Sequence, residues 1–193
     1  MENPLFTNVV IKSLFVNELN TGMNDKPIYK KDFRQLYVSR KLLNAEDIVE
    51  WAKEQGIPDM CHPDDLHVTI SYSTKLVDFS SLEPVTKKLT IRKGKRHVER
   101  LGKNPEIEGF LVLRFETNFL EERWQYYLDQ GASWDFPDYL PHVSIRKNDR
   151  DTDLSKIKPY MGDLIFGPEV IEPLGSGSEE TISLEESLRN IRF

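Results

Sequence analysis

The sequence contains a single cysteine, Cys61, so the chain cannot form an internal disulfide. It also lacks any apolar run close to the ~18 residues that a membrane-spanning helix needs, so no membrane is expected to be involved. Residues 1–7 contain no basic segment followed by an apolar stretch, and no signal peptide is expected. Together these absences predict a protein of a reducing cytoplasm.

An excess of positive charge is absent too, because 32 acidic residues against 26 basic ones give a formal net charge of -6. The protein is therefore not expected to bind nucleic acids generally or to hold a stable nucleic-acid partner. With 38% hydrophobic and 30% charged residues among 193, the composition predicts one ordinary folded domain.

One basic segment, residues 87–103, departs from this balance, because it holds eight Lys or Arg and a single acid, Glu99. Such a segment could concentrate an anionic ligand. It could equally be a solvated hairpin around Lys93-Gly94-Lys95, since charge runs are usually exposed surface. The sequence favours neither interpretation over the other.

The chain contains an internal repeat of a strand, a helix and a second strand. The predicted strands are residues 36–39 and 66–71 in the first half, and 110–113 and 142–145 in the second. Three pairs of matched positions are each 75 residues apart: Leu36 and Leu111, Gly56 and Gly131, and His67 and His142. Asn44 and Asn118 are candidate caps of the two helices, which the glycines end. The constant offset predicts an α+β domain with two pseudo-symmetric lobes.

Two of the predicted strands carry the same pattern, His-x-[Thr/Ser]-x. Because side chains alternate along a strand, His67 and Thr69 share one face, as do His142 and Ser144. Cleavage of a phosphodiester needs a base for the attacking hydroxyl and an acid for the leaving oxygen. Two histidines suit both roles near neutral pH, and two hydroxyls can donate hydrogen bonds to phosphate oxygens. The pattern predicts a phosphodiesterase that needs no metal and no other cofactor.

A metal site is the competing interpretation of the segment Cys61-His62-Pro63-Asp64-Asp65-Leu66-His67. Its donors lack a recognised zinc spacing, and Pro63-Asp64-Asp65 is typical of a turn. No metal site is therefore expected. His62 and His97 have no counterpart in the repeat and are expected at the surface.

The motifs Leu66-His67-Val68-Thr69-Ile70 and Pro141-His142-Val143-Ser144-Ile145 resemble those of the two-histidine phosphoesterase superfamily. More narrowly, residues 65–73, residues 135–142 and the helix around Trp51-Ala52-Lys53 resemble the phage anti-CBASS phosphodiesterases. Those enzymes degrade the cyclic oligonucleotide signals of a bacterial antiphage defence. The resemblance implies antiparallel sheets that form a concave cleft, with the helices outside.

The resemblance also sets the expected domain boundaries, because it covers residues 34–175. Residues 1–33 are then an N-terminal extension. Residues 176–193 are a C-terminal tail that could form a short helix through Ile182, Leu184, Leu188 and Ile191.

Relatives of this kind further imply residues that contact the nucleotide. Tyr37 matches a tyrosine on the first strand, and Glu169 matches a late glutamate, although Glu172 is close enough to be the match instead. Bases stack on aromatic side chains, and Trp134 is the favoured candidate ahead of Phe136 and Tyr139. The alternatives are packed aromatic residues and, for Glu169, an exposed acid at a strand edge.

The motifs and the resemblance together predict an enzyme that hydrolyses the 3'–5' bonds of cyclic di- or trinucleotides. It would thereby counteract CBASS in the cytoplasm of a host bacterium. The first alternative is a 2',3'-cyclic phosphodiesterase of RNA or nucleotides from the same superfamily. The second is a non-catalytic module that binds RNA or nucleotides. The oligomeric state is left open.

Overall fold

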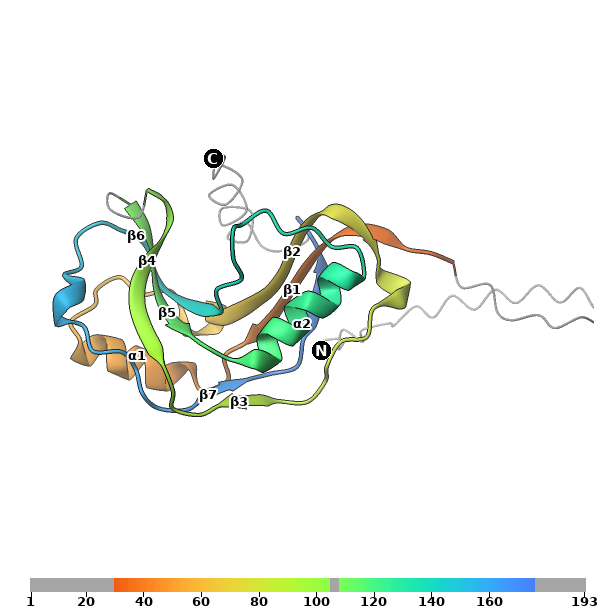
Figure 1. The fold of residues 1–193 in the computed structure, drawn as a ribbon. Coiled ribbons are helices and arrows are strands. Elements are labelled where there is room, and N and C mark those ends of the chain that lie inside the picture. The colour runs from red at the N-terminus through yellow and green to blue at the C-terminus, as the bar shows by residue number, and fades with distance from the viewer. Residues whose placement is uncertain (1–29, 105–107, 176–193) are drawn as a thin grey trace, which may run out of the picture. The chain divides into compact units, whose positions relative to one another are not determined.

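Two three-stranded antiparallel sheets form the framework of the computed structural model, which describes residues 30–104 and 108–175 (Figure 1). The first sheet has the order β2 (His67–Asp78), β1 (Phe33–Lys41), β8 (Val170–Pro173). The second has the order β4 (Arg96–Asn104), β5 (Glu108–Phe115), β6 (His142–Asp149). The chain divides into the units Met1–Lys30 and Lys31–Phe193, and all of these elements lie in the second unit.

A helix follows the central strand of each sheet: α1 (Ala45–Glu54) follows β1, and α2 (Asn118–Asp129) follows β5. Two short strands, β3 (Leu89–Ile91) and β7 (Leu164–Phe166), pair with each other. Three of the predicted strands lie within β1, β5 and β6, and the fourth, 66–71, begins one residue before β2. The α+β fold with matched antiparallel halves is therefore confirmed. The expected tail helix and nearly all of the expected N-terminal extension lie outside the described residues.

The two helices end as the repeat predicts, because Gly56 and Gly131 both have positive φ angles, +71° and +93°. Their starts differ from the prediction. Asn44 stands at the N-cap position of α1 but makes no capping bond; its side chain instead accepts from the Ile165 amide and donates to the Asp163 carbonyl. Thr117, not Asn118, precedes α2. Asn44 therefore anchors β7 and does not cap the helix.

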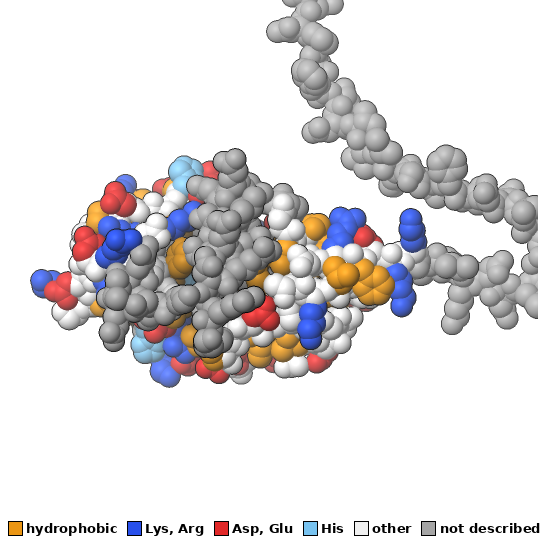
Figure 2. All heavy atoms as spheres, turned by 90° about the horizontal axis from the view of Figure 1, so that it is seen from above, with side chains coloured by type: hydrophobic (Ala, Val, Ile, Leu, Met, Phe, Trp, Pro, Cys, Tyr) orange, Lys and Arg blue, Asp and Glu red, His pale blue; other side chains and the backbone are white. Residues whose placement is uncertain are grey.

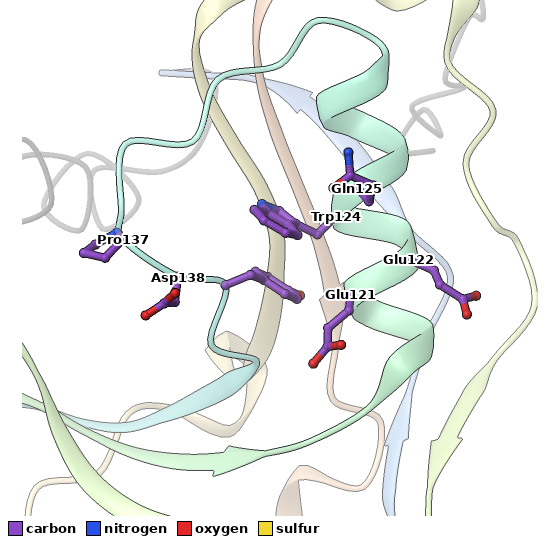
Figure 3. Close-up of a pocket in the computed structure, with 7 residues that line it drawn as sticks. Glu121, Glu122, Trp124, Gln125, Pro137 and Asp138 are labelled. Carbon is purple, nitrogen blue, oxygen red and sulfur yellow. The ribbon is translucent and has the colours of Figure 1, made fainter.

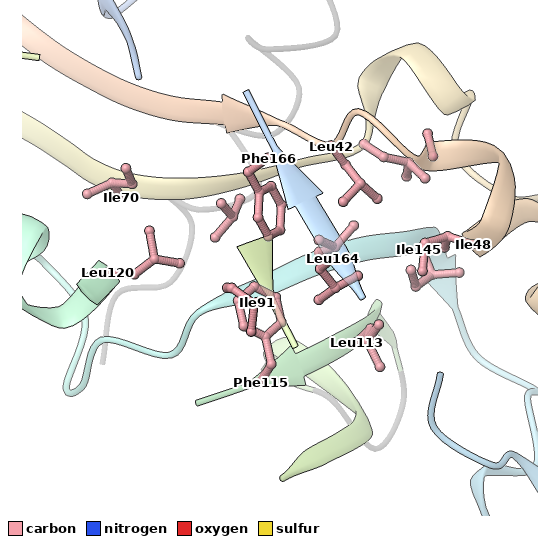
Figure 4. Packing of buried hydrophobic residues seen from close by; sticks show 14 of the residues in the cluster. Leu42, Ile48, Ile70, Ile91, Leu113, Phe115, Leu120, Ile145, Leu164 and Phe166 are labelled. Atoms are coloured by element: carbon pink, nitrogen blue, oxygen red, sulfur yellow. The ribbon is translucent and has the colours of Figure 1, made fainter. Parts of the chain in front are cut away.

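The hydrophobic core lies between the sheets and the helices, and each helix packs on the strand that belongs to the other half of the repeat. Figure 4 shows Ile48 of α1 beside Ile145 of β6, although α1 follows β1 in the chain. In the same figure, Leu120 of α2 lies near Ile70 of β2, and α2 contacts β2. This exchange ties the two halves together, because each sheet buries apolar side chains against the helix of the other half.

The basic segment 87–103 does not form the hairpin that was one of its two interpretations. β3 pairs with β7 and β4 pairs with β5, so the residues around Gly94 connect two different sheets. Arg96 is buried, and its guanidinium donates to four backbone carbonyls, those of Ile91, Arg92, Tyr160 and Gly162. On the described part of the face in Figure 2, basic and acidic side chains are interspersed. Within the described residues, no helix has the length and apolar character to cross a membrane.

Candidate active site

The two predicted histidines occupy equivalent positions, each being the first residue of its strand. His67 opens β2 and His142 opens β6, and these two strands contact each other although they share no sheet. Burial alternates as the pattern predicts: Val68, Ile70, Val143 and Ile145 are fully buried, whereas His67, Thr69, His142 and Ser144 are half-buried. We call the side that carries these last four residues the histidine face.

Both imidazole rings are held in the same way by the backbone two residues earlier. Nδ1 of His67 lies 2.5 Å from the Asp65 carbonyl oxygen, and Nδ1 of His142 lies 2.6 Å from that of Leu140. A carbonyl oxygen can only accept, so each Nδ1 carries a proton and donates it. In the neutral ring, Nε2 is then the basic nitrogen. The sequence did not predict this shared arrangement, which leaves the lone pair of each neutral ring on Nε2.

Tyr37 connects the first histidine to its neighbouring hydroxyl. Its phenol oxygen lies 2.9 Å from Nε2 of His67 and 3.1 Å from Oγ1 of Thr69. Because neutral His67 offers a lone pair at Nε2, the phenol donates to it and can accept from Thr69. Tyr37, His67 and Thr69 therefore form one hydrogen-bonded group across β1 and β2.

Electrostatics keep both rings neutral near pH 7. Burial lowers the pKa of His67, and the charge of Lys147 lowers it further, while the Asp65 carbonyl and the charge of Glu172 act in the opposite direction. Burial also lowers the pKa of His142, and the charge of His67 adds to this effect. A proton on one ring thus disfavours a proton on the other, which couples their titrations.

Glu169 does not lie on the histidine face. Its side chain has no exposed surface, and its carboxylate accepts from Arg40 and Arg123 at 3.4 and 2.9 Å and from Tyr127 at 2.9 Å. The Val85 amide donates to it as well. Burial alone would raise the pKa of Glu169, but these donors outweigh it and lower the pKa. Such burial does not fit a contact between this carboxylate and a substrate. It also means that Glu169 is not an exposed acid at a strand edge.

Glu172 is the acid beside the site. It lies on β8 directly opposite Tyr37, and residues opposite each other in an antiparallel pair project from the same face. It is half-buried, and its charge acts on the pKa of His67. Of the two glutamates that the sequence offers, Glu172 is therefore the one that shares the face of Tyr37.

Trp134 belongs to an aromatic cluster before β6, where its ring meets those of Trp124, Phe136 and Tyr139. Trp124 and Tyr139 stack with their centroids 5.4 Å apart. A pocket of about 430 Å³ opens between α2 and the segment before β6 (Figure 3). Its lining residues are Glu121, Glu122, Trp124, Gln125, Pro137, Asp138 and Tyr139. The Tyr139 hydroxyl donates to the Thr69 carbonyl at 3.0 Å, which joins this cluster to the strand of the first motif.

The segment from Cys61 to His67 forms a turn. Pro63–Asp65 is a short 3-10 helix, and the exposed His62 accepts from the Asp64 amide at its start. The Cys61 amide donates to the Ile145 carbonyl, which joins this turn to β6. His97 is exposed, as expected. In residues 30–104 and 108–175, no cluster of three or more His, Cys, Asp or Glu side chains is arranged to hold a metal ion.

Comparison with known protein families gives a match over most of the chain. The model of the family described as "Anti-CBASS protein Acb1" matches residues 34–181. The anti-CBASS protein Acb1 of Caulobacter sp. (strain RHG1) is 46% identical over 146 residues, which are 73% of this chain and 23% of that protein. Its namesake in Sphingomonas paeninsulae is 42% identical over 144 residues, 71% of this chain and 22% of that protein. The chain thus matches less than a quarter of the length of these two relatives.

More distant similarities include a phage protein and a solved structure. The anti-CBASS protein Acb1 of Escherichia phage RB16 is 28% identical over 115 residues, 60% of this chain and 63% of that protein. The crystal structure of E. coli LigT complexed with 3'-AMP has a TM-score of 0.49 and 15% sequence identity. That similarity covers 76% of this chain and 91% of the LigT chain.

Proposed function

Because the chain belongs to the family of the anti-CBASS protein Acb1, we propose that it is a metal-independent phosphodiesterase that opens cyclic oligonucleotide signals at a 3'–5' bond. Cyclic di- or trinucleotides are the substrates in this proposal. Through their cleavage the protein counteracts CBASS in the cytoplasm of a host bacterium. The name and phage origin of one relative are in keeping with that role.

The observation that carries the proposal is the matched orientation of the two imidazoles. Each donates from Nδ1 to the carbonyl two residues earlier, at 2.5 Å for His67 and 2.6 Å for His142. Packing alone does not require the same Nδ1 contact at the start of two matched strands. A paired acid and base require one ring with a lone pair on Nε2 and one ring with a proton on Nε2, and two such rings on contacting strands can share a single added proton in that way.

We propose that the attacking group is the ribose 2'-hydroxyl beside the 3'–5' bond. It is already held next to phosphorus, so its attack has the advantage of an intramolecular reaction. One histidine takes the proton of the 2'-hydroxyl, the new 2'-oxygen–phosphorus bond forms, and the phosphorus–5'-oxygen bond breaks. The other histidine carries a proton on Nε2 in the singly protonated form of the pair and gives it to the departing 5'-oxygen. Water then opens the resulting 2',3'-cyclic phosphate and leaves a linear product with a 3'-phosphate.

The proposed roles of the remaining residues follow from where they lie. Thr69 and Ser144 donate hydrogen bonds to the non-bridging oxygens of the reacting phosphate, where charge develops. Tyr37 and Glu172 contact the nucleotide from β1 and β8 on the same face. Trp134 remains the proposed base contact, supported by a half-buried indole in a segment that leads into His142.

A panel of substrates tests the proposed function. Purified protein is incubated with cyclic dinucleotides, cyclic trinucleotides and 2',3'-cyclic mononucleotides, and the products are identified by mass spectrometry. The proposal predicts linear products from the rings at rates well above those of the mononucleotides. Faster cleavage of the mononucleotides would indicate the 2',3'-cyclic phosphodiesterase, and binding without any product would indicate the non-catalytic module.

A deoxyribose analogue tests the proposed attacking group. The cyclic dinucleotide without 2'-hydroxyls beside its 3'–5' bonds is compared with the ribose parent. We expect the deoxy ring to bind but to stay intact. Efficient cleavage of the deoxy ring would instead assign the attack to water.

A further inference from the structure

Arg114 lies on the histidine face, although no motif includes it. On β5 it stands directly opposite His142 of β6, and Val112 stands opposite Ser144. On the other side of β5, Glu99 of β4 stands opposite Val112. Since paired residues of antiparallel strands project from the same face, Arg114 and Glu99 share the face of His142 and Ser144.

The guanidinium of Arg114 is oriented by one hydrogen bond, which leaves other N–H donors unused within the described residues. Nη1 donates to the Glu99 carboxylate at 3.2 Å, and the two side chains are 31% and 33% exposed. Within residues 30–104 and 108–175, Glu99 is the one hydrogen-bond partner of this guanidinium. Nε and Nη2 therefore remain available to an anion, and a guanidinium presents its donors in a planar fork that matches phosphate oxygens.

Other arginines of the fold use their donors inside the protein. Arg96 binds four carbonyls, and Arg40 is fully buried beside Glu169. Arg146 binds Asp149, Asp151 and Thr152 through Nη1. By contrast, Arg114 combines partial exposure, a single internal partner and a place next to a predicted catalytic histidine.

The charge of Arg114 also reaches the reaction centre. Burial is the main cause that lowers the pKa of His142. Of the charged groups that face it, His67 from β2 and Arg114 from β5 lower the pKa further, while Glu99 from β4 raises it. The guanidinium is thus within electrostatic range of the imidazole. A phosphate bound there would be attracted by Arg114 and would offset its effect on His142.

We propose that Arg114 is a substrate-binding residue that holds the phosphate next to the reacting one, with Glu99 fixing the orientation of its guanidinium. The position of Arg114 on β5 favours the neighbouring phosphate, because the reacting phosphate would lie between the two histidines of β2 and β6. β5 lies one strand further out than β6, about 4.8 Å away. A cyclic oligonucleotide carries at least one such additional phosphate, whereas a cyclic mononucleotide carries none. This inference rests on the proposed function and names the part of the substrate that the face recognises.

The test is steady-state kinetics on a cyclic dinucleotide with the full chain and four variants. Arg114→Gln should raise KM about tenfold or more with kcat nearly unchanged, because the contact is made in both the ground state and the transition state. Arg114→Lys should lie between this variant and the unchanged protein, since it keeps the charge but loses the fork. Glu99→Gln should raise KM by a smaller factor. Arg92→Gln, an exposed arginine on the loop before β4, is the matched control and should leave both constants unchanged.

Each outcome decides the matter. An unchanged KM in Arg114→Gln would overturn the role of Arg114, and so would a lower kcat at constant KM, which would place the contact at the reacting phosphate. Thermal melting of each variant identifies any loss that comes from unfolding; if Arg114→Gln unfolds, the folded Arg114→Lys variant decides by the same criterion. Failure of the unchanged protein to cleave the ring would refute the proposed function itself, and this inference with it.

Discussion

The phenol oxygen of Tyr37 lies 2.9 Å from Nε2 of His67, the ring nitrogen to which we assign proton transfer in the proposed reaction. It lies 3.1 Å from the Thr69 hydroxyl as well, so one tyrosine positions an imidazole and a hydroxyl on the neighbouring strand. In the proposed reaction, a substrate phosphate shares or displaces this hydrogen bond when it binds.

Replacement of Tyr37 by Phe removes this hydrogen bond and keeps the ring. A single hydrogen bond contributes ~0.5–1.5 kcal/mol, so kcat/KM should fall roughly 2- to 10-fold. Tyr126→Phe is the matched control, because its hydroxyl accepts from the Glu83 amide and, within the described residues, bonds to neither histidine. Equal kinetics for the Tyr37 variant and the unchanged protein would remove Tyr37 from the site.

Replacement of Glu169 should reduce stability, whereas replacement of Glu172 should reduce activity. Glu169→Gln removes the charge of a fully buried carboxylate that pairs with Arg40 and Arg123, and such a change costs about 3–5 kcal/mol of unfolding free energy. Glu172→Gln removes a half-buried charge opposite Tyr37, so activity should fall while stability changes by less than about 0.5 kcal/mol. Denaturant unfolding and initial rates on the same two variants check this. The reverse pattern would return the substrate contact to Glu169.

The features of the fold and the site that could be predicted from the sequence are those that depend on residues close together in the chain. The alternation around His67 and His142 and the glycines that end the helices are local patterns, and the structure follows them. The pairing of β3 with β7 joins residues far apart in the chain, and no local pattern contains it. The hairpin, one of the two interpretations of the basic segment, was wrong for this reason, because its two strands belong to different sheets.

The sequence could not distinguish Glu169 from Glu172 for the same reason. The partners that bury Glu169 are Arg40 of β1 and Arg123 of α2, 129 and 46 residues away. A single carboxylate in a sequence carries no sign of such partners. Arg114 was missed because its relation to His142 exists only through the register of β5 and β6.

Stability should fall on mild acidification because of the two histidines. Burial lowers the pKa of both in the folded state below the value of about 6.5 in the unfolded chain. The unfolded state then binds more protons, so this stability is complete above pH 6.5 and is lost as the pH falls through the folded pKa values. A His67→Asn, His142→Asn variant should show a flatter dependence between pH 6.5 and about 5, above the carboxylate range. Identical slopes in urea unfolding would contradict the pKa shifts.

Chelation should leave the enzyme active. Imidazoles carry the proposed proton transfers and hydroxyls stabilise the charge, so an excess of EDTA should change the rate of ring opening by less than twofold. Addition of a single divalent ion after chelation is the control. Loss on chelation with recovery by that ion would move the chemistry to the segment from Cys61 to His67.

The most direct test of the account is the rate of cyclic dinucleotide cleavage in His67→Ala, in His142→Ala and in the double variant. We expect each single variant to lose ~10²–10⁴-fold in kcat, as general acid or base roles typically contribute. The double variant should lose little more than either single one, because the two histidines act as a unit. Circular dichroism should show all three folded. A folded single variant with nearly full turnover would contradict the paired mechanism.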